Sequence, residues 1–308
     1  MRNHVINEIS LLAEQNSDIL LVTADLGFHV IESFRDRHPD RFINVGISEQ
    51  SMASLAAGLA LEGNTVFIYS IGNFPTLRCI EQIRNDICYH NADVKIISVG
   101  GGFAYGTLGM THHATEDIAM MRALPNMRVY APADRIEAIA CLHDSMRFKS
   151  PAFIRLAKGN EPCIWGEAQI SEVEKLLPYH AAGTDVNIIT VGTALQEGIE
   201  LQRRLAERGY STGVFSAPTV KPLDKETVCF LAKNSRLLVT IEEHTVNGGL
   251  GGTVAEAISM IREKHAVLYR AGLQDTYTSV VGSQSFLREY YGISASAIEN
   301  EITRHLSF

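Results

Sequence analysis

Residues 65–99, TVFIYSIGNFPTLRCIEQIRNDICYHNADVKIISV, decide the fold. Two runs rich in β-branched and apolar residues, Thr65 to Tyr69 and Val94 to Val99, have the composition of buried strands. Residues 76–90 lie between them and are expected to form a helix. Two buried strands joined through a helix are typical of a mostly parallel sheet that is covered on both faces.

The same alternation continues toward the N-terminus and toward the middle of the chain. Further strands are expected at Ile19 to Thr23, Arg128 to Tyr130 and Ala152 to Leu156, and further helices near 48–62, 116–124 and 133–147. A polar, irregular stretch then breaks the rhythm from Lys158 onward, with Pro162, Gly166 and Pro178. Such a stretch is typical of a linker between domains.

The strand and helix pattern resumes after this stretch. Strands are expected at Val186 to Val191, Thr212 to Ser216 and Leu237 to Ile241, with helices near 194–208, 248–263 and 294–305. We therefore expect an α/β chain of two domains, each a mostly parallel sheet flanked by helices. The predicted boundaries are a first domain at 1–165, a linker at 166–183 and a second domain at 184–308.

The composition excludes several classes of partner. The chain has 308 residues and a formal net charge of −8 without a basic run, which argues against nucleic acid and anionic membrane surfaces. It has no run of about 18 apolar residues and no secretory start, so a cytoplasmic location is expected. The five scattered cysteines lack Cys-x-x-Cys spacing, so neither disulfides nor zinc is predicted. Small molecules and other proteins remain.

Glu49 is the first candidate for chemistry. It stands at the start of an expected helix, three residues before Met52, and so faces the same apolar stripe. Burial favours the protonated carboxyl, whereas a helix N-terminus favours the carboxylate. A protonatable group in a dry site is suited to acid–base work. The alternative is an ordinary first-turn glutamate that only complements the helix dipole.

The segment 99–113, VGGGFAYGTLGMTHH, follows an expected strand and is too glycine-rich for a packed element. Loops at the carboxyl ends of parallel strands are where open α/β sheets place ligands. His112 and His113 can exchange protons there near neutral pH. Adjacent residues rarely converge on one metal ion, so proton transfer or substrate binding is the preferred interpretation. A flexible loop with incidental histidines is the alternative.

A second glycine-rich stretch, Gly248 to Gly252, opens an expected helix after Glu242-Glu243-His244. It has the look of a phosphate-binding loop, but it has neither Gly-x-Gly-x-x-Gly nor Walker spacing. Close packing of the helix on the strand explains these glycines equally well. His244 is interpreted as a structural histidine.

Taken together, these segments resemble the pyrimidine-binding and C-terminal domains of transketolases, deoxyxylulose-phosphate synthases and the beta subunits of 2-oxo acid dehydrogenases. The resemblance covers nearly the whole chain. Its carriers, in chain order, are Thr23-Ala24-Asp25-Leu26, Gly46-Ile47-Ser48-Glu49-Gln50, Ala56-Ala57-Gly58-Leu59-Ala60, Glu81-Gln82-Ile83-Arg84-Asn85-Asp86, Thr111-His112, Glu116-Asp117-Ile118-Ala119, Arg122-Ala123-Leu124-Pro125-Asn126-Met127, Pro132-Ala133-Asp134, Lys221-Pro222-Leu223-Asp224 and Glu242-Glu243-His244.

The resemblance implies roles for four residues. Glu49 matches the glutamate that hydrogen-bonds the aminopyrimidine ring of thiamine diphosphate and so activates the cofactor. Asp25 matches an acidic residue near the cofactor, and Phe74 is the candidate aromatic against the pyrimidine. His112 matches the substrate-facing histidine that binds a ketose hydroxyl or moves protons. His113 stands where these families often have Gln, and no role is assigned to it.

The resemblance also implies a missing half. In these families a separate domain holds the diphosphate and its Mg²⁺ with a Gly-Asp-Gly motif, which does not occur in this sequence. A diphosphate needs a metal ion or a nest of donors to be bound. A partner chain with that motif is therefore expected, in an α2β2 heterotetramer.

Departures from transketolases concern the substrate. Leu108 stands where an Asp usually reads a sugar hydroxyl, and Gly100 stands where a phosphate-contacting His is common. Lys158 replaces an Arg that usually binds the phosphate, and Arg155 is a nearby alternative; His29 stands where a Ser often contributes. A lysine holds a phosphate or sulfonate as a point charge without the bidentate fork of arginine. A deoxy, branched or non-phosphorylated sugar is thus a possible variant substrate.

The leading prediction is a transketolase component that transfers a two-carbon ketol unit from a ketose, with a phosphorylated one preferred, to an aldose. The alternative is decarboxylating chemistry on pyruvate or another oxo acid, and a third hypothesis is a homologue without catalysis. Glu49 and His112 argue against the third hypothesis, although a shared fold alone would not.

Overall fold

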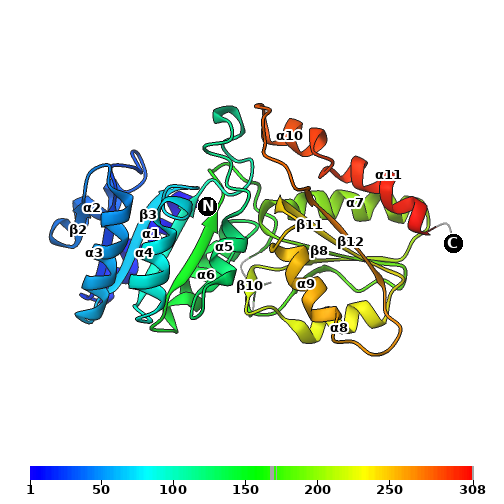
Figure 1. Ribbon diagram of the computed structural model, residues 1–308, viewed down its shortest axis with the longest axis horizontal. Helices are drawn as coiled ribbons and strands as arrows, with labels where there is room; N and C mark the ends of the chain where they lie inside the picture. The colour runs from blue at the N-terminus through cyan, green and yellow to red at the C-terminus, as the bar shows by residue number, and fades with distance from the viewer. Residues whose placement is uncertain (167–169, 171, 307–308) are drawn as a thin grey trace.

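The computed structural model describes residues 1–166, 170 and 172–306. It confirms a two-domain α/β fold, and Figure 1 shows the two domains side by side. None of the described helices is long and apolar enough to span a membrane.

The first sheet has seven strands in the order β10-β5-β6-β4-β3-β1-β2. All of its neighbours run parallel except β10, which pairs antiparallel with β5. The strands are β1 (Ile19–Thr23), β2 (Phe42–Asn44), β3 (Thr65–Ile71), β4 (Val94–Val99), β5 (Arg128–Tyr130), β6 (Ala152–Leu156) and β10 (Thr219–Lys221). Because the parallel strands end at one edge, the loops after β1, β3, β4 and β6 gather there.

Helices cover both faces of this sheet. On one face lie α1 (Arg2–Gln15), α2 (Glu32–Arg37) and α6 (Arg135–Met146), and their apolar residues pack with Leu21 and Phe67. On the other face lie α3 (Glu49–Leu61), α4 (Ile80–Gln82), the π-helix η3 (Ile83–Cys88) and α5 (Asp117–Ala123), packed with Val66 and Ile68. The helix expected at 76–90 is therefore a 3₁₀ turn at Leu77–Cys79 followed by α4 and η3.

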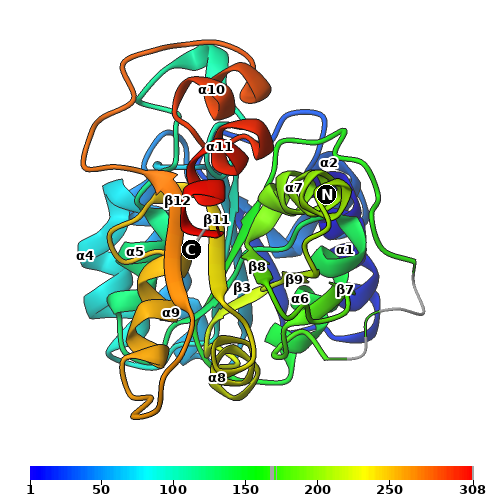
Figure 2. The same ribbon diagram turned by 90° about the vertical axis from the view of Figure 1, so that its right-hand side faces the viewer.

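The second sheet has five strands in the order β12-β11-β8-β9-β7. They are β7 (Leu177–His180), β8 (Val186–Thr190), β9 (Thr212–Ser216), β11 (Leu237–Thr245) and β12 (Val267–Leu273). The helices are α7 (Leu195–Glu207), α8 (Lys225–Lys233), α9 (Leu250–Ile258), α10 (Gln284–Tyr290) and α11 (Ala295–Leu306). Figure 2 shows α7 and α9 on opposite sides of β8 and β11.

The two domains share structure across their boundary. β7 joins the second sheet although it falls inside the stretch predicted as a linker, and β10 returns from the second domain to the first sheet. One apolar cluster also runs from α3 and α5 of the first domain to α8 and α9 of the second. The numerical division at 165 and 183 stays a prediction.

Candidate active site

Glu49 is the first residue of α3 and is 3% exposed. The helix buries it because Met52, Ala53 and Ala56 anchor the same stretch in the core below the sheet edge. Arg78, in the segment after β3, donates from Nη1 to Glu49 Oε2 over 2.8 Å. The carboxyl thus has a cationic partner that the sequence did not predict.

Phe74 and His112 lie next to this pair. The Arg78 guanidinium carbon stands 4.7 Å from the centre of the Phe74 ring. The Phe74 and His112 rings meet edge to face, with their centroids 5.4 Å apart. The structure therefore brings Glu49, Phe74 and His112 together through Arg78, although they come from three different loops and helices.

His112 is half-buried and has one local partner, because its Nδ1 lies 3.0 Å from Thr111 Oγ1. Burial lowers the pKa of His112 below its ordinary value of 6.5, and the neighbouring His113 lowers it further. The ring is therefore neutral near pH 7 and can accept a proton from a hydroxyl group.

Asp25 and His29 follow β1 at the same edge. Both have positive φ, 54° and 63°, in a left-handed conformation that Asp and His adopt more readily than most residues. The Asp25 N–H donates to Asn44 Oδ1 over 3.0 Å, and the His29 N–H donates to Glu32 Oε1 over 2.8 Å. These contacts fix the backbone of the loop. A role for either side chain toward a cofactor or substrate stays a prediction.

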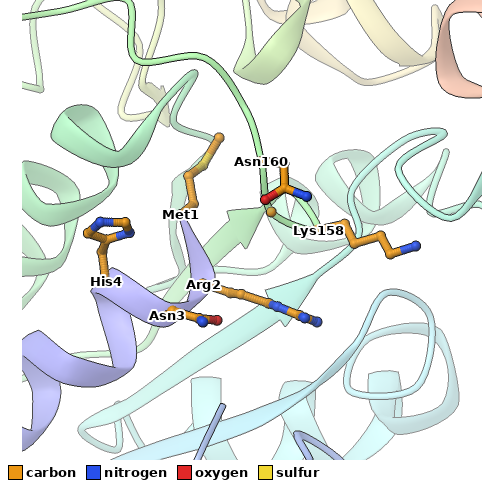
Figure 3. A pocket seen from close by; sticks show the side chains of 7 residues that line it. Met1, Arg2, Asn3, His4, Lys158 and Asn160 are labelled. Atoms are coloured by element: carbon orange, nitrogen blue, oxygen red, sulfur yellow. The ribbon is translucent and has the colours of Figure 1, made fainter. Parts of the chain in front are cut away.

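Lys158 lines a pocket of about 390 Å³ together with the start of α1. Figure 3 shows the side chains of Lys158 and Arg2 extending in the same direction from the two walls. The Lys158 Nζ lies 5.1 Å from the centre of the Tyr105 ring, which in turn stands 6.3 Å from the His112 ring. Two cations thus stand beside the His112 side of the site. The pocket continues toward His29, because Asn3 also lines the pocket that contains His29.

Arg155 has a different environment from Lys158. It is 6% exposed, and its Nε donates to Asp117 Oδ2 over 2.9 Å. Its Nη2 donates to the carbonyl oxygens of Ala114 and Glu243, at 2.6 Å and 3.0 Å. These bonds tie the loop before α5 to the second domain. A contact between Arg155 and a substrate stays a prediction, while Lys158 offers the exposed charge.

The glycine-rich loop is fastened by the second domain. Glu243 on β11 accepts a hydrogen bond from the Phe103 N–H over 2.9 Å and also contacts Arg288 and Gln284. Gly102 has a φ of +63°, and a Cβ there would lie 2.4 Å from Glu243 Oε2. Glycine is therefore required where the loop passes the carboxylate.

His113 is a buried connection between the domains and is 1% exposed. Its Nε2 lies 3.0 Å from the carbonyl oxygen of Gly106, and its Nδ1 lies 2.7 Å from Thr278 Oγ1. A carbonyl only accepts, so Nε2 carries the proton and Nδ1 accepts from the threonine. With both nitrogens engaged, His113 holds the loop that presents His112.

The second glycine-rich stretch serves its own helix. The N–H groups of Leu250 and Gly251 donate to the buried Glu242 carboxyl over 2.7 Å and 2.8 Å, so these donors are occupied. A Cβ at Gly249 would lie 2.0 Å from Glu242 Oε2, which explains the glycine. His244 is fully buried, and burial lowers its pKa to about 4. The geometry favours packing over phosphate binding, as the sequence spacing did.

Metal ligands and two arginines complete the description of the site. Within residues 1–166, 170 and 172–306, no three His, Cys, Asp or Glu side chains converge in a way that could hold a metal ion. The donors for a Mg²⁺ of a bound diphosphate are therefore not assembled in the described part of this chain. The sequence analysis missed Arg78 and Arg2, because no local pattern marks them; both acquire their surroundings only through folding.

Comparisons with known proteins agree with this architecture. Residues 1–162 match the model of the transketolase pyrimidine binding domain, and residues 177–298 match that of the transketolase C-terminal domain. One of the two apulose-4-phosphate transketolase chains, that of Actinobacillus succinogenes, is 30% identical over 97% of this chain and 96% of its own length.

Two further relatives differ in length. The 1-deoxy-D-xylulose-5-phosphate synthase of Listeria monocytogenes serotype 4b is 31% identical over 98% of this chain, which spans 49% of that enzyme. The solved structure described as a split gene transketolase, inactive beta4 tetramer, superimposes with a TM-score of 0.87 at 31% identity and covers 99% of this chain and 97% of that one.

Proposed function

The chain belongs to the transketolase family, and from that premise we propose that it is one component of a two-chain, thiamine-diphosphate-dependent transketolase. The complex transfers a two-carbon ketol unit from a ketose to an aldose. The observation that carries the proposal is the convergence of Glu49, Phe74 and His112 at the carboxyl edge of the first sheet. A buried carboxyl beside an aromatic face fits the edge and the face of an aminopyrimidine ring.

In this proposal Glu49 binds the edge of the pyrimidine and Phe74 packs on its face, with Asp25 nearby. When bound, thiamine diphosphate supplies a nucleophilic carbon that adds to the donor carbonyl and stabilises the charge left when the carbon–carbon bond breaks. Glu49 acts by holding a proton at the pyrimidine edge. Its burial keeps water away from that proton.

His112 binds a hydroxyl group of the sugar or accepts its proton. The pKa of His112 is lowered by burial, so the neutral ring is the form present near pH 7. His113 does not face the substrate in this proposal. It positions His112 through the loop that it fastens.

The anionic end of the sugar binds at Lys158 and Arg2. Both cations line one pocket beside Tyr105 and His112, and a phosphate or sulfonate is stabilised by two positive charges at this distance from the reacting carbons. His29 stands beside the same pocket. The relative from Actinobacillus succinogenes is named for a phosphorylated sugar, which is in keeping with such a substrate.

A partner chain completes the site. It brings the Gly-Asp-Gly motif, the diphosphate contacts and the Mg²⁺ ligands, which are not assembled in the described residues. The Actinobacillus succinogenes relative is itself named as one chain of a divided transketolase, and the solved structure comes from a split gene. Both support a two-chain enzyme, for which we propose an α2β2 arrangement.

The second candidate function is a decarboxylating synthase, favoured by the match to the Listeria monocytogenes synthase over nearly the whole chain. The first experiment is therefore co-purification with a Gly-Asp-Gly-bearing chain and calorimetric titration of thiamine diphosphate with Mg²⁺. We expect binding by the pair and none by this chain alone. Tight binding by the lone chain, or none by the pair, would refute the proposal.

Substrate assays on the same pair separate the two chemistries. Ketol transfer predicts an aldose-dependent product from a ketose without release of carbon dioxide. Carbon dioxide evolved on addition of pyruvate would favour the synthase instead. A pair that binds the cofactor but turns over neither class of substrate would point to a homologue without catalysis.

The anion pocket makes a separate prediction. Replacing Lys158 or Arg2 by Met should raise the KM for a phosphorylated ketose about tenfold, because each change removes one charge-assisted contact. The KM for the same ketose without its phosphate should hardly change. Steady-state kinetics of the two substrates provides the test, and equal effects on both would place the phosphate elsewhere.

A further inference from the structure

Arg78 occupies an unusual position for a cation whose side chain is 48% exposed. One edge of its guanidinium contacts the buried Glu49 carboxyl at 2.8 Å. Its face lies over the ring of Phe74, with 4.7 Å between the guanidinium carbon and the ring centre. These are the two groups to which the proposed function assigns the edge and the face of the pyrimidine.

The guanidinium has the chemistry to stand in for that ring. It is planar, it carries N–H donors along its edge and it stacks on aromatic faces. An aminopyrimidine uses the same two kinds of contact, an edge hydrogen bond and a stacked face. Arg78 and the ring therefore cannot occupy this position at the same time.

The two ends of the ion pair differ in their freedom to move. Glu49 is fixed on α3 and is 3% exposed, whereas nearly half of the Arg78 side chain faces solvent. The backbone around the arginine is held in place, since the Cys79 thiol donates to the Phe74 carbonyl and the Arg78 N–H donates to the Asn73 carbonyl. Only the side chain of Arg78 needs to swing out to clear the site.

We propose that Arg78 is a displaceable placeholder, which occupies the pyrimidine position in the lone chain and leaves when the cofactor enters. This inference rests on the proposed function. The arginine keeps the buried carboxyl paired before the cofactor binds, since an unpaired buried charge is costly. Its displacement opposes cofactor binding, so that Arg78 sets the affinity of the assembled enzyme.

The test is calorimetric titration of thiamine diphosphate with Mg²⁺ into the reconstituted pair, with Arg78→Met compared with wild type. Arg84→Met is the matched control, because Arg84 is an exposed arginine of the next turns that binds Asn85. We expect Arg78→Met to bind the cofactor about three- to tenfold more tightly, in the range of a partly exposed ion pair. Arg84→Met should bind like wild type.

The possible outcomes separate this inference from the proposed function. Equal or weaker binding by Arg78→Met, with normal binding by the wild-type pair, overturns the placeholder role alone. The same tightening in Arg84→Met overturns it too, because the effect is then one of general charge. If the wild-type pair binds no cofactor, the proposed function fails and the placeholder role fails with it.

A second measurement uses only the wild-type pair, in case Arg78→Met does not assemble. Phenylglyoxal modifies accessible arginines, and peptide mass spectrometry reports the rate at Arg78. We expect thiamine diphosphate with Mg²⁺ to accelerate the modification of Arg78, because the cofactor releases the guanidinium from Glu49. Protection of Arg78 by the cofactor would mean that the arginine clamps the ring, and the inference would be wrong.

Discussion

On one side of the candidate site, the glycine-rich loop is fixed by buried contacts from the second domain, whereas on the other side Glu49 is held by a half-exposed arginine. His113 and Glu243 each have several buried partners within this chain. Glu49 has a cation that can withdraw into solvent. The comparison teaches that the substrate-facing loop is complete in the lone chain, while the Glu49 side is arranged to exchange its partner.

The largest expected effect is on the Glu49 side. In the reconstituted pair, Glu49→Gln should lower kcat by about 100- to 10,000-fold, because an amide cannot exchange the proton that the pyrimidine edge needs. Circular dichroism and thermal unfolding should remain close to wild type. The control is Glu62→Gln at the other end of α3, an exposed position. Turnover within about threefold of wild type would remove Glu49 from the centre of the mechanism.

The next effect concerns the stability of the fixed side. Arg288 is 6% exposed and pairs with both Glu243 and Glu197. Replacing Arg288 by Met leaves two carboxylates without their cation, which should reduce the free energy of unfolding by about 3 to 5 kcal/mol. Urea unfolding of the isolated chain measures this. Arg304→Met, at an exposed pair, is the control and should have little effect.

Much of this fold could be predicted from the sequence because its central strands are buried on both faces. Such strands appear as continuous apolar runs, and those at Thr65 to Tyr69 and Val94 to Val99 lie where the composition indicated. The short antiparallel β10 and the largely exposed β12 have no such run. They were missed because their pairing is set by the rest of the sheet.

The site divides in the same way. Glu49 and the glycine-rich loop carry local signals, a first-turn carboxyl and a loop too rich in glycine to pack. Arg78 and Arg2 carry none, because their role depends on which distant side chains folding brings beside them. The burial of His113 against Thr278 is likewise a contact over a long sequence separation. A sequence pattern alone cannot distinguish it from its exposed neighbour.

The two adjacent histidines should therefore respond in opposite ways to substitution. His113→Ala should cost about 1 to 3 kcal/mol of stability, because it leaves a buried hydroxyl and a buried carbonyl without their partner. His112→Ala should unfold like wild type but lower kcat/KM in the pair by about tenfold or more, through loss of a substrate hydrogen bond. Urea unfolding and steady-state kinetics on both variants test this. Equal losses of stability would contradict the division between the two sides.

The smallest expected effect is a shift in the pH profile. Burial, assisted by His113, lowers the pKa of His112 below 6.5, so the neutral ring persists to lower pH than in an exposed histidine. If the neutral ring binds the sugar hydroxyl, activity is present above that pKa and is lost as the pH falls through it. The acid limb of kcat/KM that depends on His112 should thus lie below 6.5 and disappear in His112→Asn. A limb above that ordinary value would mean that the charged form is the active one or that another group titrates, and the half-buried histidine would then differ from its buried neighbour in exposure alone.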